Sequence, residues 1–262
     1  SVATDAIAAC YMPEANAPAL IDEVDRQLQD IRIGAGGKII THWSKDIAAD
    51  IMTEVERHMA NPREISGYST GYSQLDYIID GLRRQSLHVV AAETSSGKSL
   101  FVHNLTSHLA GQGVKTLVTS TEMSMSSVYR RLAYMRAGVD KVNRRMRGGY
   151  TSEDQRRIRE AVEFIGREPI GFNEVSELPR ILAEARRQRK QNAIEVLVVD
   201  HLDDVSVPGG LNGTQAADAK MQGLKTLAME EELAVVAVSQ LSRKTEFNQN
   251  SRLSRLRDGG GK

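Results

Sequence analysis

The chain has 262 residues, of which 40% are apolar and 26% charged, and this ordinary globular composition argues against disorder along its whole length. No apolar run reaches the roughly 18 residues of a membrane-spanning helix, and the single cysteine, Cys10, excludes a disulfide framework and a cysteine-based zinc site. The 34 basic and 34 acidic residues give a formal net charge of +0, which excludes the global basic excess that would indicate nucleic-acid binding.

Charge is distributed unevenly along the chain. Residues 1–60 hold ten acidic and five basic residues and carry a net charge of −5, whereas residues 240–262 hold six basic residues against Glu246 and Asp258. Such a local basic stretch can bind an anion while the whole chain stays neutral. Ser1 is not a starting methionine, so we expect a piece of a longer chain. No signal-peptide pattern begins the sequence, which favours an intracellular, reducing compartment.

The N-terminal 35 residues are predicted to be helical. Met12-Pro13 interrupts the pattern, so two helices are expected, followed by a flexible joint at Gly34–Gly37. Spacings of three and four give the second helix one apolar face, which consists of Ile21, Val24, Leu28 and Ile31.

A further amphipathic helix is predicted over residues 41–60. Thr41 or Ser44 can cap its start, and Asn61-Pro62 ends it. Its apolar stripe consists of Ile47, Ile51, Val55 and Met59. Because this helix lies between Gly-rich and Pro-containing breaks, two interpretations stay open. It is either a core helix of the same domain or an arm that docks on a neighbouring subunit.

From Gly67 onward, predicted strands alternate with predicted helices. Strands that are apolar along their whole length are buried on both faces, as in a parallel sheet, and the alternation indicates an α/β fold with crossover connections. The predicted strands are 87–92, 115–121, 194–200 and 233–239. The predicted helices are 98–110, 124–138, 152–165, 176–190 and 215–231.

The segment Glu93–Ser99 carries most of a phosphate-binding loop. The P-loop pattern is GxxxxGK[ST] between a strand and a helix, and here Ala92 replaces the first glycine while Gly97, Lys98 and Ser99 keep the functional end. Backbone N–H groups and the helix N-terminus cradle phosphates because both present positive partial charge. The alternative interpretation is an ordinary strand-to-helix turn.

Three polar residues follow other predicted strands. Asp200 ends an apolar strand, where a P-loop ATPase needs an acid that holds hydrated Mg²⁺. Glu122 follows the strand 115–121 and could orient an attacking water, although an acid that favours a helix N-terminus is an equal alternative. Gln240 follows the last strand, where a neutral amide could contact a γ-phosphate or simply form a polar strand end.

The chain resembles the ATPase domain of replicative DnaB-family helicases, which are hexameric motors with a RecA-like core. The matching stretches, in order, are Thr70–Asp76, Gly81-Leu82, Val90–Ser99, Ser120–Ser124, Val198–Leu202, Val238–Arg243 and Leu253–Asp258. The resemblance implies the end of a helical N-terminal domain over 1–36, a linker helix and hinge over 37–64, and a RecA-like P-loop ATPase domain, C-terminally incomplete, over 65–262. The fold class is thus α/β, with a mainly parallel sheet between helices and a small helical N-terminal segment.

The resemblance implies roles for matched residues, with ATP and Mg²⁺ as cofactors. Lys98 matches the Walker A lysine, and Ser99 matches the hydroxyl that binds Mg²⁺ together with the Walker B residue Asp200. Glu122 matches the catalytic glutamate, and Gln240 matches the γ-phosphate-sensing glutamine. The other nucleotide-binding positions are Thr94, Ser95, Ser96, Gly97 and Leu100.

The resemblance also implies binding of single-stranded DNA in the central channel of a homohexamer. Arg257, Asp258 and Gly260 match the family's DNA-binding loop, and six such loops around a pore would concentrate charge that one neutral chain lacks. His201 and Asp203 depart from the aromatic and amide residues that usually follow the Walker B strand, which puts local packing in doubt. The family's arginine finger matches no residue of this sequence.

The function implied is that of an ATP-dependent replicative helicase in the cytoplasm of a bacterial or phage-infected cell. It would move 5′ to 3′ on single-stranded DNA, with primase and a helicase loader as further partners. Two alternatives stay open: a RecA-type recombinase or a related DNA-dependent ATPase, and an inactive paralogue that acts as a binding protein.

Overall fold

The computed structural model describes residues 44–93 and 96–241, and the chain divides into two compact units, 1–55 and 56–262. The helices expected within residues 1–35 and the basic stretch after Leu241 lie outside the described residues. The domain boundaries inferred from the sequence stay predictions.

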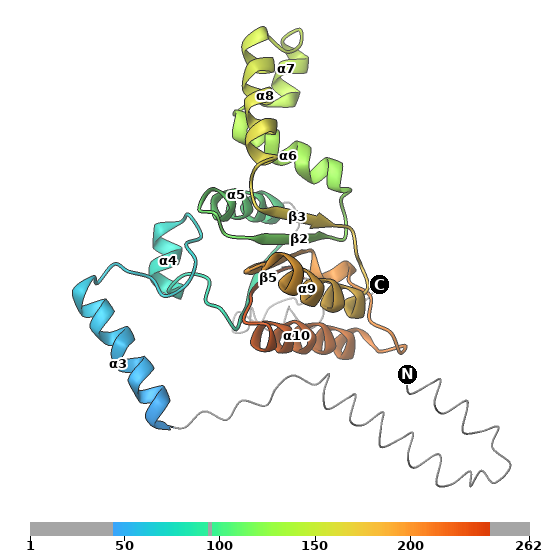
Figure 1. The fold of residues 1–262 in the computed structure, drawn as a ribbon. Coiled ribbons are helices and arrows are strands. Elements are labelled where there is room, and N and C mark those ends of the chain that lie inside the picture. The colour runs from blue at the N-terminus through green and yellow to red at the C-terminus, as the bar shows by residue number, and fades with distance from the viewer. Residues whose placement is uncertain (1–43, 94–95, 242–262) are drawn as a thin grey trace, which may run out of the picture. The chain divides into compact units, whose positions relative to one another are not determined.

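The described residues form an alternating series of helices and strands (Figure 1). The helices are α3 (Ser44–Ala60), α4 (Ser73–Ile79), α5 (Lys98–Gly111), α6 (Met125–Ala137), α7 (Lys141–Met146), α8 (Ser152–Ile165), α9 (Leu178–Asn192) and α10 (Gly213–Glu230), and the 3₁₀ turn η1 is Leu202–Asp204. The strands are β1 (Ser86–Ala92), β2 (Thr116–Ser120), β3 (Ile170–Asn173), β4 (Val196–Asp200) and β5 (Ala234–Gln240). No helix among the described residues is long and apolar enough to cross a membrane.

The five strands form one sheet in the order β1-β5-β4-β2-β3, and every neighbouring pair is parallel. The predicted α/β fold with a mainly parallel sheet is therefore confirmed. Helix α5 covers one face of the sheet, and helices α9 and α10 cover the other (Figure 1). All carboxyl ends of the strands consequently meet at one edge.

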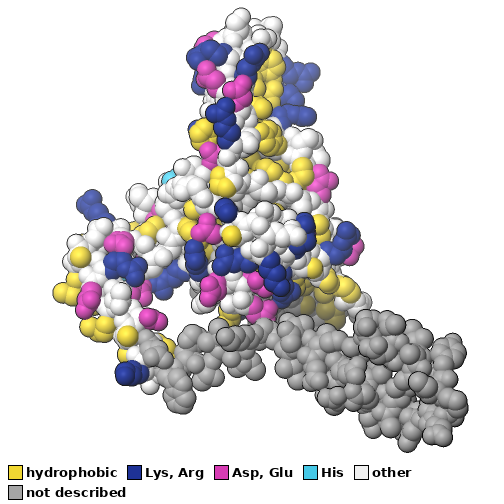
Figure 2. Space-filling view, viewed as in Figure 1, with side chains coloured by type: hydrophobic (Ala, Val, Ile, Leu, Met, Phe, Trp, Pro, Cys, Tyr) yellow, Lys and Arg dark blue, Asp and Glu magenta, His cyan; other side chains and the backbone are white. Residues whose placement is uncertain are grey.

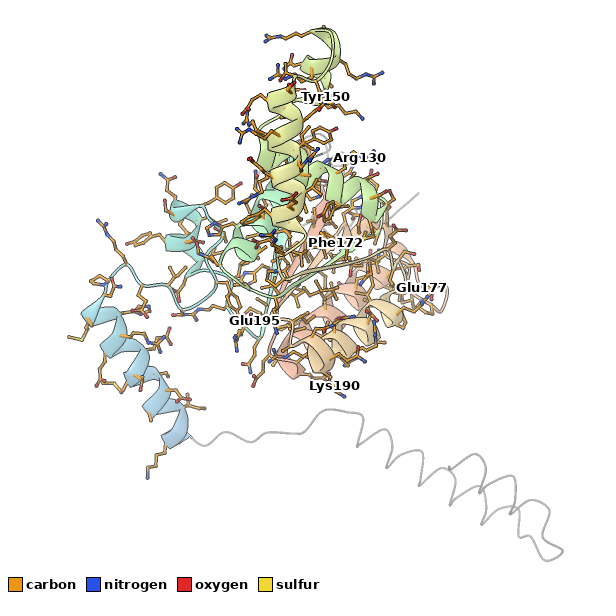
Figure 3. The ribbon with its side chains drawn as sticks, turned by 45° about the horizontal axis from the view of Figure 1, so that its top comes forward. Arg130, Tyr150, Phe172, Glu177, Lys190 and Glu195 are labelled. Carbon is orange, nitrogen blue, oxygen red and sulfur yellow. The ribbon has the colours of Figure 1, made fainter. Side chains whose placement is uncertain are left out.

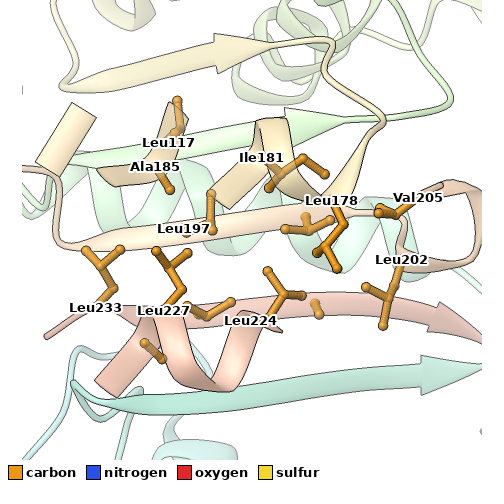
Figure 4. Close-up of a cluster of buried hydrophobic side chains, with 14 of the residues drawn as sticks. Leu117, Leu178, Ile181, Ala185, Leu197, Leu202, Val205, Leu224, Leu227 and Leu233 are labelled. Carbon is orange, nitrogen blue, oxygen red and sulfur yellow. The ribbon is translucent and has the colours of Figure 1, made fainter. Parts of the chain in front are cut away.

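Burial on both faces explains why the central strands are almost wholly apolar. In β4, Leu197 and Val199 pack among residues of α9 and α10, while Val196 and Val198 pack on the opposite face among residues of α5. All four side chains have 0% exposure. Figure 4 shows the first of these two clusters, which joins leucines of α9 and α10 to β2 and β4. The hydrophobic core thus lies on both faces of the sheet and supports the edge at which the strands end.

Helices α6, α7 and α8 form a separate helical group between β2 and β3 (Figure 1). Val128, Leu132 and Ile165 pack together at its base, and Arg130 and Tyr150 mark two levels of it in Figure 3. Figure 2 shows Lys and Arg side chains interspersed with Asp and Glu over this group. Arg156 pairs with both Glu153 and Glu160 on α8, so part of this charge is a solvated, ion-paired surface.

The turns before β1 are fixed by polar side chains. Tyr68 and Leu82 form an isolated antiparallel bridge, and the Tyr68 hydroxyl donates to Glu195 Oε1 at 2.8 Å. Arg84 donates to both the Tyr68 hydroxyl (2.8 Å) and Glu195 Oε1 (2.9 Å). Burial, aided by Glu195, raises the pKa of Tyr68 to about 12, so its hydroxyl stays a donor at neutral pH. The network ties the amino end of β1 to that of β4.

The nine predicted helices and strands after residue 85 all occur, with ends that shift by at most two residues. The predicted helix 41–60 is observed as α3, although residues 41–43 lie outside the described part. Three short elements were not predicted: α4, α7 and β3.

Candidate functional site

The predicted site residues on strands gather at one edge of the sheet. Ala92, which ends β1, pairs with Gln240 at the end of β5, and Asp200 at the end of β4 pairs with Ser120 of β2. Because β5 lies between β1 and β4, Gln240 lies between Asp200 and the loop that leaves β1. Glu122 follows two residues after β2. The edge of a parallel sheet where carboxyl ends meet is the usual place for a ligand in such folds.

The loop after β1 leads directly into α5. Gly97 caps this helix with φ +91°, a conformation that strains an L side chain, although the space around its missing Cβ is open. Backbone conformation, and not crowding, therefore requires glycine here. Lys98 Nζ donates to the carbonyl oxygens of Ala92 and Glu93, each at 2.8 Å. The ammonium thus lies over the start of the loop, beside the N-terminus of α5, where backbone N–H groups attract anions.

Asp200 is a partly buried carboxyl at the end of β4, beside the first turn of α5. Burial raises its pKa above the usual value, and the charge of Glu122 adds to this rise. His201, a hydrogen bond from the Ser99 side chain and the charge of Arg131 act in the opposite direction without cancelling it. Partial burial therefore outweighs the nearby positive charges in setting the direction of this shift.

The donor set at this point fits a magnesium ion. The Ser99 hydroxyl and the Asp200 carboxylate already contact each other, and oxygen ligands of this kind are those that Mg²⁺ prefers. A divalent cation would favour the ionised form of this partly buried carboxyl, against the rise in its pKa. Glu122 is exposed in the bend after β2, close enough to Asp200 for its charge to raise that pKa.

A threonine that was not predicted holds the two acids near each other. The Thr121 hydroxyl donates to the His201 carbonyl oxygen (2.9 Å) and accepts from the His201 N–H (3.0 Å). The Thr121 N–H donates to the Asp200 carbonyl oxygen at 2.9 Å. These three bonds join the turn after β2 to the turn after β4, so the Thr121 side chain and backbone together hold the segment of Glu122 near Asp200.

The end of β5 is held from both sides. The Leu241 N–H donates to the Ala92 carbonyl oxygen at 3.1 Å, and the Gln240 N–H donates to Asp203 Oδ2 at 2.6 Å. Asp203 is thus a second contributor that the sequence reasoning missed. Its one signal was its departure from the amide expected at that position.

The other predicted site residues are placed as follows. Ser96 donates from its hydroxyl to the Glu93 carbonyl oxygen at 2.6 Å, and Leu100 is 52% exposed on the first turn of α5. The remaining ones lie outside the described residues: Thr94, Ser95, Arg257, Asp258 and Gly260.

Residues 67–261 match the family model of the DnaB-like helicase C-terminal domain. The chain is 29% identical over 261 residues to the replicative DNA helicase DnaB of Geobacillus stearothermophilus, covering 95% of this chain and 56% of the relative. It is 31% identical over 227 residues to the DnaB of Buchnera aphidicola subsp. Acyrthosiphon pisum, covering 82% and 49%. The chain therefore spans about half the length of the curated relatives that it matches.

Solved structures show the same fold. One solved ATPase domain aligns with a TM-score of 0.71 at 24% identity, over 84% of this chain and 80% of that chain. A DnaB-like replicative helicase, described with its interactions with primase, aligns with a TM-score of 0.69 at 23% identity, over 99% and 61%. The expected RecA-like fold is therefore confirmed.

Proposed function

The chain belongs to the family of DnaB-like helicase C-terminal domains, and on this premise we propose that it is the motor of an ATP-driven replicative DNA helicase. The observation that carries the proposal is the sheet edge where Lys98, Asp200 and Gln240 lie together. A phosphate loop, an acid and an amide at neighbouring strand ends are the parts that hydrolysis of a nucleoside triphosphate requires.

The phosphates of ATP would bind at the N-terminus of α5. Lys98 would exchange its two carbonyl acceptors for β- and γ-phosphate oxygens, because a charged acceptor forms a stronger bond with an ammonium than a neutral carbonyl does. Ser99 and Asp200 would hold Mg²⁺, which when bound neutralises charge on the phosphates. Gln240 would face the γ-phosphate and respond to its loss.

Glu122 would act as the general base. Its carboxylate would accept a proton from a water whose oxygen attacks the γ-phosphorus, while the bond from that phosphorus to the β–γ bridging oxygen breaks and ADP leaves. Its exposed position at the sheet edge supports this role, since the water must reach the site from solvent. Thr121 would keep the carboxylate in place.

DNA binding would depend on assembly. We propose a homohexamer in which the loop with Arg257, Asp258 and Gly260 lines a central channel and grips the backbone of single-stranded DNA. The apolar stripe of α3 supports a role for this helix as a tie between subunits, because a single helix cannot bury its own stripe. Primase and a helicase loader are the further partners proposed.

The test is unwinding of forked DNA by the full-length protein with ATP and Mg²⁺. One fork carries only a 5′ single-stranded loading arm and the other only a 3′ arm. We expect unwinding of the first fork alone, and its loss in Lys98→Ala. Lys98→Arg, which keeps the charge but not the shape, tests whether geometry also matters.

Two results would contradict the proposal. Unwinding from the 3′ arm would reverse the direction of travel. ATP hydrolysis stimulated by single-stranded DNA without unwinding of either fork, together with helical filaments in electron micrographs, would instead support a recombinase.

A further inference from the structure

Asp203 lies beside the end of β5, where a longer neighbouring strand would otherwise supply the hydrogen-bond acceptors. The register between β4 and β5 ends at the pair Val199 and Ala237, whereas β5 continues to Gln240. Beyond Ala237, the side of β5 that faces β4 therefore lacks a ladder partner among the described strands. Asp203 supplies acceptors there: Oδ2 accepts the Gln240 N–H at 2.6 Å, and Oδ1 accepts the Ser239 hydroxyl at 3.2 Å.

A buried lysine holds the turn that carries Asp203. Lys220 of α10 is 7% exposed, and its Nζ donates to the carbonyl oxygens of Leu202 (3.0 Å) and Asp203 (3.1 Å). Burial lowers the pKa of Lys220, and the charges of Asp203 and Asp204 oppose that change. The turn η1 is thus fixed to α10 by a buried cation, and the carboxylate that contacts β5 is one of two negative charges, with Asp204, that act on this cation.

These contacts matter because the position of a strand's end determines where its last side chain points, and the last residue of β5 is Gln240. The other side of β5 is fixed to β1 through the Leu241 N–H and the Ala92 carbonyl oxygen. With Asp203 removed, the Gln240 N–H would lose this acceptor, and the side of the strand end that faces β4 would lose the support that Asp203 gives. The amide of Gln240 would then shift by a fraction of an ångström, and misplacement on this scale lowers catalytic rates steeply.

We propose that Asp203 is a positioning residue that sets the place of Gln240 at the nucleotide site, with Lys220 holding the turn in position. The inference rests on the proposed function, because it concerns how Gln240 meets a γ-phosphate. It also gives a reason for the acid that stands where an amide is expected. A carboxylate can accept from two donors and can neutralise the lysine beneath it.

Two substitutions separate position from charge. Asp203→Ala removes both acceptors. Asp203→Asn keeps an oxygen for the Gln240 N–H, and its amide N–H can donate to the Ser239 hydroxyl, which also accepts. The asparagine variant therefore retains the contacts and loses only the negative charge.

The experiment measures ATP hydrolysis stimulated by single-stranded DNA in the full-length protein. We expect Asp203→Ala to lower kcat about tenfold or more with little change in KM, because Lys98 and Ser99 are untouched. Asp203→Asn should restore most of kcat. Gln240→Ala should lose as much as Asp203→Ala, and the double variant should lose no more than either, since both act through one amide.

Hydrogen exchange at the Gln240 backbone amide provides a readout that needs no activity. We expect faster exchange in Asp203→Ala than in wild type or Asp203→Asn, with unchanged exchange at Val235 near the start of β5, which would show that the fold is intact. Unchanged exchange at Gln240, wild-type kcat in Asp203→Ala, or losses that multiply in the double variant would each overturn the inference. Equal turnover by wild type and Lys98→Ala would instead count against the proposed function, and the exchange result would still decide the position of Gln240.

Discussion

At the scale of single residues, Asp200 is a partly buried acid whose surroundings raise its pKa above the usual value. Burial raises its pKa, and Glu122 raises it further. A carboxyl whose pKa is higher in the folded than in the unfolded protein weakens folding at every pH above both values. The site therefore holds a charge that opposes folding and that a magnesium ion would neutralise.

We expect Asp200→Asn to raise the thermal unfolding temperature of the ligand-free protein at neutral pH, because it removes the partly buried charge while keeping an acceptor for Ser99. The same variant should lose Mg²⁺-dependent nucleotide binding and hydrolysis. Calorimetry with and without MgATP measures both effects. Glu163→Gln, an exposed change on α8, is the control. A lower unfolding temperature in Asp200→Asn would show that the carboxylate stabilises the fold.

Asp80 differs from Asp200 because the folded protein lowers its pKa. Although burial raises its pKa, the Ser66 N–H, which donates at 2.9 Å, and Arg83, whose Nε donates at 3.0 Å, lower it to about 2. A lowered carboxyl pKa contributes stability that is present above the unfolded value of 3.8 and is lost as the pH falls toward about 2.

Asp80→Asn should therefore cost about 1 kcal/mol at neutral pH, allowing for solvent screening, and nearly nothing near pH 2. Asparagine tolerates the left-handed φ of +60° at this position, so the substitution adds no backbone strain, and it removes the charge together with one of the two oxygen acceptors. Urea unfolding at several pH values measures the difference. A cost that does not change with pH would mean that hydrogen-bond geometry, and not ionisation, is responsible.

Some residues of the candidate site could be predicted from the sequence and others could not, for a physical reason. Lys98 and Asp200 have fixed positions relative to a strand, so a motif and its spacing predict them. Thr121 and Asp203 act through contacts between segments that are far apart in the sequence, so no local pattern predicts these contacts, and only the departure of Asp203 from the expected amide drew attention to it. The loop residues Thr94 and Arg257, which lie outside the described part, stay predictions.

At the scale of elements, the start of α8 is fixed by a reciprocal cap. The Thr151 hydroxyl accepts the Asp154 N–H at 3.1 Å, and Asp154 Oδ2 accepts the Thr151 N–H at 2.9 Å. Asp154 is fully buried and also pairs with Arg144 of α7 at 2.8 Å. One turn therefore joins two helices of the α6–α8 group.

Thr151→Ala should destabilise the protein by about 1 kcal/mol, because it leaves the Asp154 N–H without its cap. Thr151→Ser, which retains the hydroxyl, is the matched control and should cost much less. Urea midpoints of the two variants give the comparison. Equal midpoints would indicate that the ion pair with Arg144 is sufficient to fix the turn.

The elements that were predicted differ from those that were missed in length and in burial. Strand β4 is apolar throughout because it is covered on both faces, and such a run is visible in the sequence. Strand β3 has four residues and includes Gly171, and α7 has six residues, so neither spans enough periods to give a pattern. Both are formed by tertiary contacts with neighbouring elements.

At the scale of the whole molecule, α3 is the element on which the proposed assembly depends. We expect Ile51→Ser, on the apolar stripe, to dissociate hexamers of the full-length protein and to weaken binding of single-stranded DNA along with them. Asp50→Ser, on the preceding residue but off the stripe, should leave both unchanged. Sedimentation velocity and DNA titration at one fixed salt concentration measure the two effects, since DNA affinity varies with salt. Intact hexamers in Ile51→Ser would assign the stripe to another contact.

The parallel sheet also dictates an order of events during synthesis of the chain. Strand β1, which leads into the candidate phosphate loop, is an edge strand whose ladder partner is β5. Ser86 of β1 can therefore pair with Ala234 only after the ribosome has synthesised β5. Until then a nascent chain on the ribosome exposes an apolar strand edge, which is a template for misassociation. Chains truncated before Ala234 should therefore require chaperones and fail to retain nucleotide in filter-binding assays. Binding of the nucleotide at the proposed site would therefore become possible only when β5, the last strand of the sheet along the chain, has been synthesised.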